Sequence, residues 1–113
     1  MPEREWLNDL EQLLLLAVAR LGDDAYGMKI RQVIQRRGKR EVPIASIYAA
    51  LERLERRDCL ASWLAEPTPE RGGRAKKHFA LTKQGAALLH EERGALDQMW
   101  EGLELRPGTR SAS

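Results

Sequence analysis

Arginine and lysine dominate the side chains of this chain that could do chemistry, and their placement favours the binding of phosphate groups. Between Lys29 and Lys83 the sequence carries 14 Lys or Arg against 6 Asp or Glu, whereas both flanking segments are acidic and the net charge is only +2. A basic segment between two acidic ones predicts a face that binds a polyanion. The alternative is a solvated surface with scattered ion pairs.

One basic group follows a run of small residues on an expected helix from Ile44 to about Arg57. Its apolar face comprises Ile44, Ile47, Tyr48, Leu51 and Leu54, and its opposite face Ala45, Ser46, Ala49 and Ala50, followed by Arg53, Arg56 and Arg57. Small side chains let a helix lie close to another surface, and arginine suits phosphate. Tyr48 either contacts a phosphate or packs in the core, and Arg53 either contacts a backbone or pairs with Glu52, Glu55 or Glu41.

The second basic group lies in a hairpin. Strands are expected from Leu60 to Glu66 and from Arg74 to Leu81. The segment between them is a turn cluster that ends in Arg71, Gly72 and Gly73. Lys76 and Lys77 point to opposite faces of the second strand, so at least one of them faces solvent.

Residues for catalysis or metal binding are scarce. Cys59 is the one cysteine and there are two histidines, so a disulfide within the chain and a multi-cysteine metal site are excluded. The sequence shows no catalytic set and no phosphate-binding loop, and we expect no enzyme activity, no cofactor and no metal. Cys59 is expected to be a small buried hydrophobe, with a redox sensor as the alternative.

Three further helices should position these groups. The first runs from about Glu5 to Leu21 and is apolar on nearly every side, so either part of it faces a second subunit or it is the central helix of a bundle. The second follows Gly22, is capped by Asp23 or Asp24 and ends at Gly38. The last is capped by Thr82 and runs to about Leu105.

Local signals fix several joints between these elements. Pro43 fits at or just before the start of the third helix, and Asp58 is a plausible left-handed residue at its end. Residues 106–113 should form a disordered tail. The longest apolar run, Leu13 to Ala19, is too short to cross a membrane, and the N-terminus does not read as a signal peptide, so a cytoplasmic location with no membrane partner is expected.

Three helices followed by a basic hairpin predict a winged helix-turn-helix over residues 5–81 and a C-terminal dimerisation helix over residues 82–105. The fold class is therefore mainly α with a small β-hairpin. In this geometry the helix at 44–57 enters the major groove of double-stranded DNA and the hairpin at 60–81 is the wing. The expected DNA-binding residues are Ala45, Ser46, Tyr48, Ala49, Arg53, Arg71, Gly72, Gly73, Arg74, Lys76 and Lys77.

Four stretches, in order and spacing over about residues 7 to 90, resemble the PadR-like transcriptional regulators. They are the leucine-rich run 13–19, Asp24-Ala25-Tyr26-Gly27 with Ile30, the run from Ser46 to Glu55, and the wing run from Glu66 to Arg74 followed by Leu81-Thr82 and Gly85. A single short C-terminal helix resembles the compact branch of that family.

The resemblance implies a homodimeric repressor of transcription that dimerises through its first and last helices. The expected dimer residues are Leu10, Leu13, Leu14, Ala17, Leu88, Leu89, Leu96, Met99, Trp100 and Leu103. A two-fold dimer should bind an inverted-repeat operator. Drug-responsive relatives stack planar ligands on an aromatic residue in the last helix, where this chain has Leu96 and, one turn later, Trp100. Plain dimer packing is the favoured interpretation, and any effector is unknown.

A dimeric winged-helix adaptor that binds only proteins is the alternative function. Such an adaptor would not need a basic wing, so the wing charge favours DNA.

Overall fold

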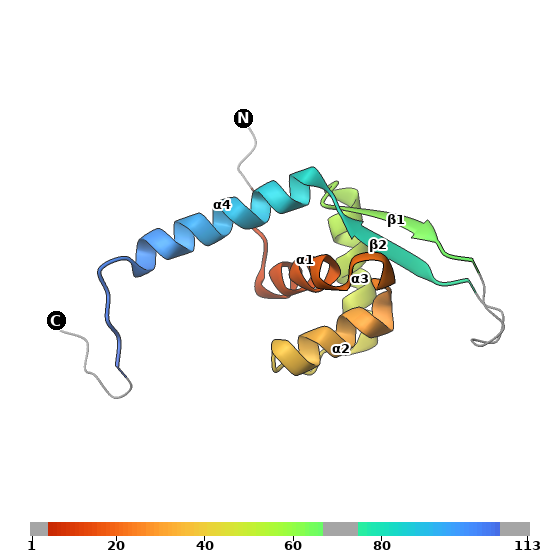
Figure 1. The fold of residues 1–113 in the computed structure, drawn as a ribbon, viewed down its shortest axis with the longest axis horizontal. Coiled ribbons are helices and arrows are strands. Elements are labelled where there is room, and N and C mark those ends of the chain that lie inside the picture. The colour runs from red at the N-terminus through yellow and green to blue at the C-terminus, as the bar shows by residue number, and fades with distance from the viewer. Residues whose placement is uncertain (1–4, 67–74, 107–113) are drawn as a thin grey trace.

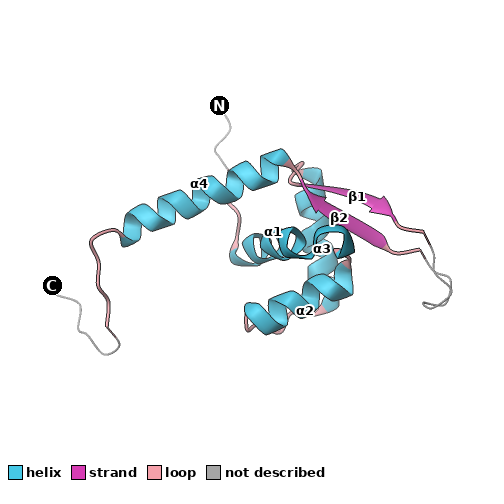
Figure 2. Cartoon of the chain, in the orientation of Figure 1, coloured by secondary structure: helices cyan, strands magenta, loops and turns pink. Residues whose placement is uncertain are grey.

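A computed structural model describes residues 5–66 and 75–106 of the chain. Its elements are α1 (Asp9–Leu21), the 3₁₀ turn η1 (Gly22–Asp24), α2 (Gly27–Arg37), α3 (Ile44–Arg56), β1 (Leu60–Leu64), β2 (Lys77–Leu81) and α4 (Lys83–Trp100). The first three helices form a body from which the hairpin and α4 project on opposite sides (Figures 1 and 2). The predicted order of helices and strands is confirmed. The wing tip and the tail lie outside the described residues.

A capping box starts α1 four residues later than the sequence pattern predicted. The Asn8 side chain accepts a hydrogen bond from the Glu11 amide at 2.8 Å, and the Glu11 carboxylate accepts one from the Asn8 amide at 2.9 Å. This reciprocal pair satisfies two amides that a helix start leaves without partners. Residues 5–8 are therefore extended rather than helical, and the predicted start at Glu5 is wrong.

The joint between α1 and α2 differs from the prediction in its cap. Gly22 has φ 57°, which confirms the left-handed end of α1. Neither Asp23 nor Asp24 caps α2, because both belong to η1 and Tyr26 stands at the N-cap without a side-chain bond. Asp24 instead pairs with Lys29 at 2.9 Å.

Backbone chemistry sets both ends of α3. Pro43 stands at the N-cap, and Ser46 and Ile47 donate their amides to its carbonyl. Asp58 has φ 58°, which confirms the predicted left-handed stop. Lys39, in the turn before α3, has φ 55° and is the other described non-glycine residue in this conformation.

The hairpin is anchored to the helical body at its root. β1 pairs antiparallel with β2 in a register that sets Leu60 opposite Leu81 and Leu64 opposite Lys77, so both strands are shorter than predicted. The Phe79 amide donates to the Ala25 carbonyl at 2.8 Å, and Tyr26 forms an isolated bridge with His78. Ala25 and Tyr26, just after η1, therefore pair with β2 in the manner of a short third strand.

Polar contacts fasten the start of α4 to the turn between α3 and β1. The Thr82 hydroxyl accepts from the Gly85 amide at 3.0 Å, which confirms the predicted cap, and donates to the Asp58 carbonyl at 2.6 Å. Gln84 donates to the Arg57 carbonyl at 2.9 Å. The helix ends at Trp100, earlier than the predicted Leu105, and Gly102 follows with φ 82°.

One apolar core joins α1, α2, α3 and the root of the hairpin. Its fully buried side chains come from every one of these elements, and include Leu14, Leu15, Ile30, Ile47, Leu51, Leu54, Cys59 and Phe79. Each large apolar side chain buried in this way stabilises the fold by about 1.5–3 kcal/mol. The core therefore holds α3 and the hairpin in a fixed relation.

Candidate nucleic-acid interface

The exposed face of α3 begins with three small residues. Ala45, Ser46 and Ala49 are exposed, whereas Ile47, Leu51 and Leu54 are buried in the core. The predicted small face is thus confirmed at these three positions. Ala50 departs from it, because its side chain is fully buried and contributes to the core. Apart from Tyr48, the exposed side chains over residues 45–49 are no longer than serine, and small side chains let a helix approach the floor of a groove closely.

Tyr48 belongs to this exposed face and not to the core. Its side chain is 47% exposed, and its ring lies over Gly27 at the start of α2. A Cβ at position 27 would stand 2.6 Å from the tyrosine hydroxyl, so glycine makes room for the ring. The alternative of pure core packing is therefore wrong, and Tyr48 shares the exposed face of α3 with Ser46 and Ala49.

Several of the predicted DNA-binding cations are held by carboxylates or rings of the domain itself. Arg53 lies 3.6 Å from Glu11 of α1, a partner that the sequence analysis did not include. Lys77 lies 3.1 Å from Glu55, which also accepts from the Ser62 hydroxyl at 2.6 Å. Lys76 stands over the ring of Tyr26, 4.6 Å from its centroid. These contacts fix where the charges of Arg53, Lys76 and Lys77 stand.

These hydrogen bonds also change the acidity of Glu55. Those from Ser62 and Lys77 lower the pKa of its carboxyl below the ordinary value of 4.5. The carboxylate form is therefore favoured, and with it the contact between α3 and the hairpin.

Exposed cations without an ion pair in the described part of the chain gather elsewhere. Arg36 and Arg37 end α2, Lys39 lies in the turn that leads into α3, and Arg56 lies on the last turn of α3. The sequence analysis did not assign the first three to the site. The run Arg36-Arg37-Gly38-Lys39-Arg40 was the signal, since four cations flank one glycine. Arg40 is partly neutralised by Asp9 at 3.1 Å.

The wing tip carries the other predicted contacts. Arg71, Gly72, Gly73 and Arg74 lie outside the described residues. The strands that precede and follow them are described, and β1 and β2 project from the helical body on the side opposite to α4 (Figure 1).

Comparison with known proteins identifies this arrangement. The family model described as the transcriptional regulator PadR-like family matches residues 15–91, which is most of the described chain. The chain belongs to the PadR-like family. It is therefore a DNA-binding transcriptional regulator with a winged-helix fold, as its resemblance implied.

Solved structures show the same fold. A PadR-like transcription factor from Bacteroides fragilis shares 26% identity with a TM-score of 0.70, covering 81% of this chain and 84% of its own. A PadR family regulator from Eggerthella lenta shares 23% with a TM-score of 0.65, covering 83% and 81%. BpsR of Bordetella bronchiseptica, whose DNA binding is regulated by 6-hydroxynicotinic acid, shares 21% with a TM-score of 0.61, covering 92% and 72%. No curated protein matches the chain.

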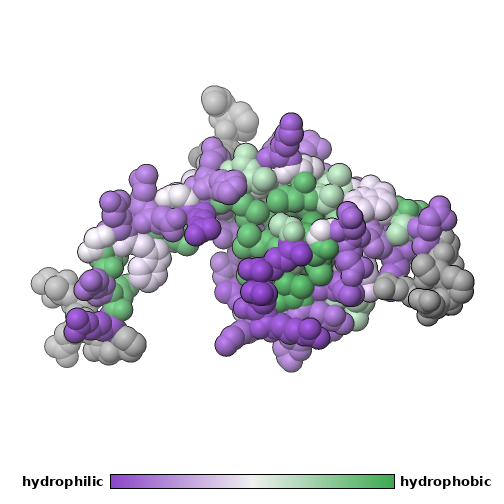
Figure 3. Space-filling model, viewed as in Figure 1, coloured by the Kyte–Doolittle hydropathy of each residue, from purple (hydrophilic) through white to green (hydrophobic). Residues whose placement is uncertain are grey.

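The PadR-like chain carries a second feature, an apolar groove between α1 and α4. It has a volume of about 750 Å³, and the residues that line it include Trp6, Leu16, Ala19, Leu89, Leu96 and Met99. Apolar surface gathers over α1 and the adjoining part of α4, bordered by polar residues (Figure 3). Trp6 is therefore a groove residue that the sequence analysis missed. Trp100, which it considered for ligand stacking, is not among the lining residues.

Some of the predicted dimer residues are not available to a partner. Leu14 and Ala17 are buried in the core of their own domain, so their assignment to a dimer interface is wrong. Leu10, Leu13, Leu88 and Leu89 are half-buried against that core. Leu96, Met99, Trp100 and Leu103 are exposed, and so is Leu16, which the prediction omitted.

The remaining chemistry of this PadR-like chain is limited. Cys59 is fully buried, and burial raises the pKa of its thiol, so it is the small hydrophobe that was expected and an inert nucleophile. Within residues 5–66 and 75–106, no cluster of three or more His, Cys, Asp or Glu could hold a metal ion. No helix in that part of the chain is long and apolar enough to span a membrane.

Proposed function

We propose that this PadR-like regulator is a homodimeric repressor that binds an inverted-repeat operator. Helix α3 reads bases in the major groove, and the hairpin at residues 60–81 contacts the adjacent backbone as a wing. Residues 5–81 form the DNA-binding unit and residues 82–105 hold the dimer, followed by a tail at 106–113. The observation that carries the proposal is the exposed face of Ala45, Ser46 and Ala49, beside Tyr48 and flanked by cations.

The roles of the residues follow from their chemistry. Ser46 can reach a base edge or a phosphate, and Ala45 and Ala49 offer methyl groups that suit the methyl of thymine. Cations at the wing and around α3 supply contacts to phosphates, which give affinity without reading sequence. The exposed cations Arg36, Arg37 and Lys39 support this role, because they lie at the end of α2 and in the turn that leads into α3.

Dimerisation is supported by the apolar surface that one subunit leaves open. Leu16 of α1 and Leu96 and Met99 of α4 border one groove, and Leu103 follows on the same chain. Covering one such side chain is worth about 1.5–3 kcal/mol, so several of them could sustain a dimer. A second copy of this surface is a suitable cover, since soluble homo-oligomers are most often two-fold dimers.

Regulation by a small molecule is a further part of the proposal. The neighbour BpsR responds to 6-hydroxynicotinic acid, and the groove here has the size of a small-molecule site. Trp6 fluorescence, measured in a variant with Trp63→Phe and Trp100→Phe, should change when a ligand enters this groove.

Salt dependence of duplex binding tests the proposal. Two subunits that neutralise about 6 to 10 phosphates should lose about 10³- to 10⁵-fold in affinity between roughly 50 and 200 mM salt. Arg71→Gln with Arg74→Gln should weaken binding to all sequences alike and flatten the salt slope, whereas Ser46→Ala should change sequence preference. Absence of duplex binding in low salt would favour a protein-binding adaptor.

A further inference from the structure

Helix α4 leaves the body of the protein at Glu92. Up to that point the helix is packed, since Gly85 is buried and Leu88 and Leu89 lie against the core. Glu92 is the last buried residue of α4, and every residue from Arg93 to Trp100 is exposed. The direction of the exposed half of the helix is therefore set by the contacts at Glu92 and just before it (Figure 1).

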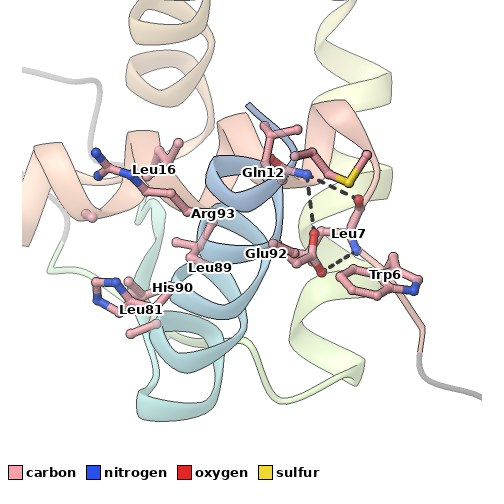
Figure 4. A pocket seen from close by; sticks show the side chains of 14 residues that line it. Trp6, Leu7, Gln12, Leu16, Leu81, Leu89, His90, Glu92 and Arg93 are labelled. Carbon is pink, nitrogen blue, oxygen red and sulfur yellow. Dashed lines mark hydrogen bonds between the residues drawn. The ribbon is translucent and has the colours of Figure 1, made fainter. Parts of the chain in front are cut away.

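The Glu92 carboxylate holds the segment that precedes α1. Its Oε2 accepts a hydrogen bond from the Leu7 amide at 2.9 Å, and its Oε1 accepts one from the Gln12 side-chain amide at 3.3 Å. The same Gln12 nitrogen also lies 3.4 Å from the Leu7 carbonyl (Figure 4). The two oxygens of this buried carboxylate thus accept hydrogen bonds from two different donors, which fixes the orientation of Glu92 relative to the segment before α1.

The next residue along the chain is held by a different helix. The Asn8 amide donates to Glu11 of α1, so the successive amides of residues 7 and 8 are bound by carboxylates from α4 and α1. Glu11 is itself buried and lies 3.6 Å from both Arg53 of α3 and Arg57, the residue that follows α3. We name residues 5–8 the N-terminal strap. The strap and its two carboxylates connect α4 to the C-terminal half of α3.

We propose that Glu92 is a positioning residue that fixes the direction of α4 through the N-terminal strap, and thereby fixes the half-site spacing that the regulator accepts. This inference rests on the proposed function, since it concerns a dimer that binds two half-sites. Half-sites one helical turn apart place the two reading helices about 34 Å apart. Over that lever, a change of about 6° in the direction of α4 moves one reading helix by roughly the rise of one base pair, about 3.4 Å.

The test compares binding to a series of duplexes with the same two half-sites at different spacings, and to a duplex with one half-site. The variants are Glu92→Gln, which keeps the shape, and Glu92→Ala, which leaves the Leu7 amide without its acceptor. Gln12→Met removes the second contact and keeps the test open if Glu92→Ala does not fold. Glu101→Gln, an exposed carboxylate at the end of α4, is the matched control.

The wild type and the control should bind duplexes of one spacing about tenfold or more tightly than the others. This ratio corresponds to the free energy of one hydrogen bond to a charged group, such as that between Glu92 and the strap. The Glu92 and Gln12 variants should lose most of that preference while binding the single half-site as the wild type does. An unchanged spacing preference overturns the proposal. Equal weakening on every duplex, the half-site included, also overturns it, because Glu92 then only stabilises the fold.

Failure of the proposed function gives a different result from failure of this inference. If the wild type binds no duplex, the regulator proposal fails and this inference falls with it. If the wild type binds duplexes but accepts every spacing equally, the regulator proposal stands and the positioning role of Glu92 is rejected.

Discussion

Gly85 of α4 lies directly against the main chain of Cys59, and a Cβ at position 85 would stand 2.4 Å from the Cys59 carbonyl oxygen. The neighbour is backbone and belongs to the turn that also receives Thr82 and Gln84, so it has little freedom to yield. The close contact brings α4 onto the turn between α3 and β1.

Gly85→Ala should therefore destabilise the protein by about 1–3 kcal/mol, the cost of forcing an extra methyl group into a packed site. Urea unfolding followed by circular dichroism measures this. Gly94→Ala is the matched control, because position 94 of the same helix has open space around it. That change should stabilise by about 0.5–1 kcal/mol, since alanine is the better helix former. Equal stability of the two variants would contradict the packing described here.

The contact between α3 and the hairpin should depend on pH through Glu55. Its pKa is lower in the folded protein than its ordinary value of 4.5, so its contribution to stability is present above pH 4.5 and is lost as pH falls through the folded pKa. Glu55→Gln should thus cost stability at pH 7 and almost none at pH 3. The effect should be well under about 1 kcal/mol, because the group is partly exposed. Glu52→Gln, an exposed neighbour on α3, is the control, and an identical pH profile for both variants would argue against the effect.

Cys59 should react with thiol reagents only when the protein opens. Its side chain is fully buried and burial raises the pKa of the thiol, so little thiolate is available in the folded state. We expect reaction with an aromatic disulfide reagent to be slow in buffer and fast in urea. Ala61→Cys in a Cys59→Ala background places a thiol on an exposed position of β1, and it should react quickly in buffer. Fast reaction of the native Cys59 would contradict its burial.

Charge on the exposed half of α4 should abolish dimerisation. Leu96→Lys with Met99→Lys places two cations on the apolar side of the groove, and it should convert a dimer into a monomer in sedimentation experiments. Gln98→Lys is the control, because position 98 is exposed and is not among the groove residues. If the double variant remained a dimer, the dimer interface would have to lie on another surface.

Local chemistry made much of the fold predictable. Thr82 caps α4 through its hydroxyl, and the ring of Pro43 suits the start of α3. Asp58 tolerates the left-handed conformation in which α3 ends. Apolar periodicity located every helix. The start of α1 was missed, although Asn8 and Glu11 have the spacing of a capping box, because the apolar pattern extends past it.

Contacts between distant segments were not predictable in the same way. The sequence offered Arg53 a contact with the DNA backbone or a pairing with Glu52, Glu55 or Glu41, yet its carboxylate partner is Glu11 on another helix. Ala50 is buried although the pattern placed it on the exposed face, and Tyr48 is exposed although the pattern placed it on the apolar face. Gly27 makes room for the tyrosine ring outside the core. Glu92 interrupts the apolar stripe of its helix, and only the path of residues 5–8 gives it donors.

The pairing of Ala25 and Tyr26 with β2 also bears on how the protein avoids sticking to other copies of itself. A two-stranded ribbon has two free edges, and each can recruit a strand from another molecule. Here the Phe79 amide is taken by the Ala25 carbonyl, so the outer edge of β2 is occupied near its centre. Among the described residues β1 pairs only with β2, so we expect strand addition at its other edge, and a charged residue at the exposed Leu64 should lower the tendency to aggregate.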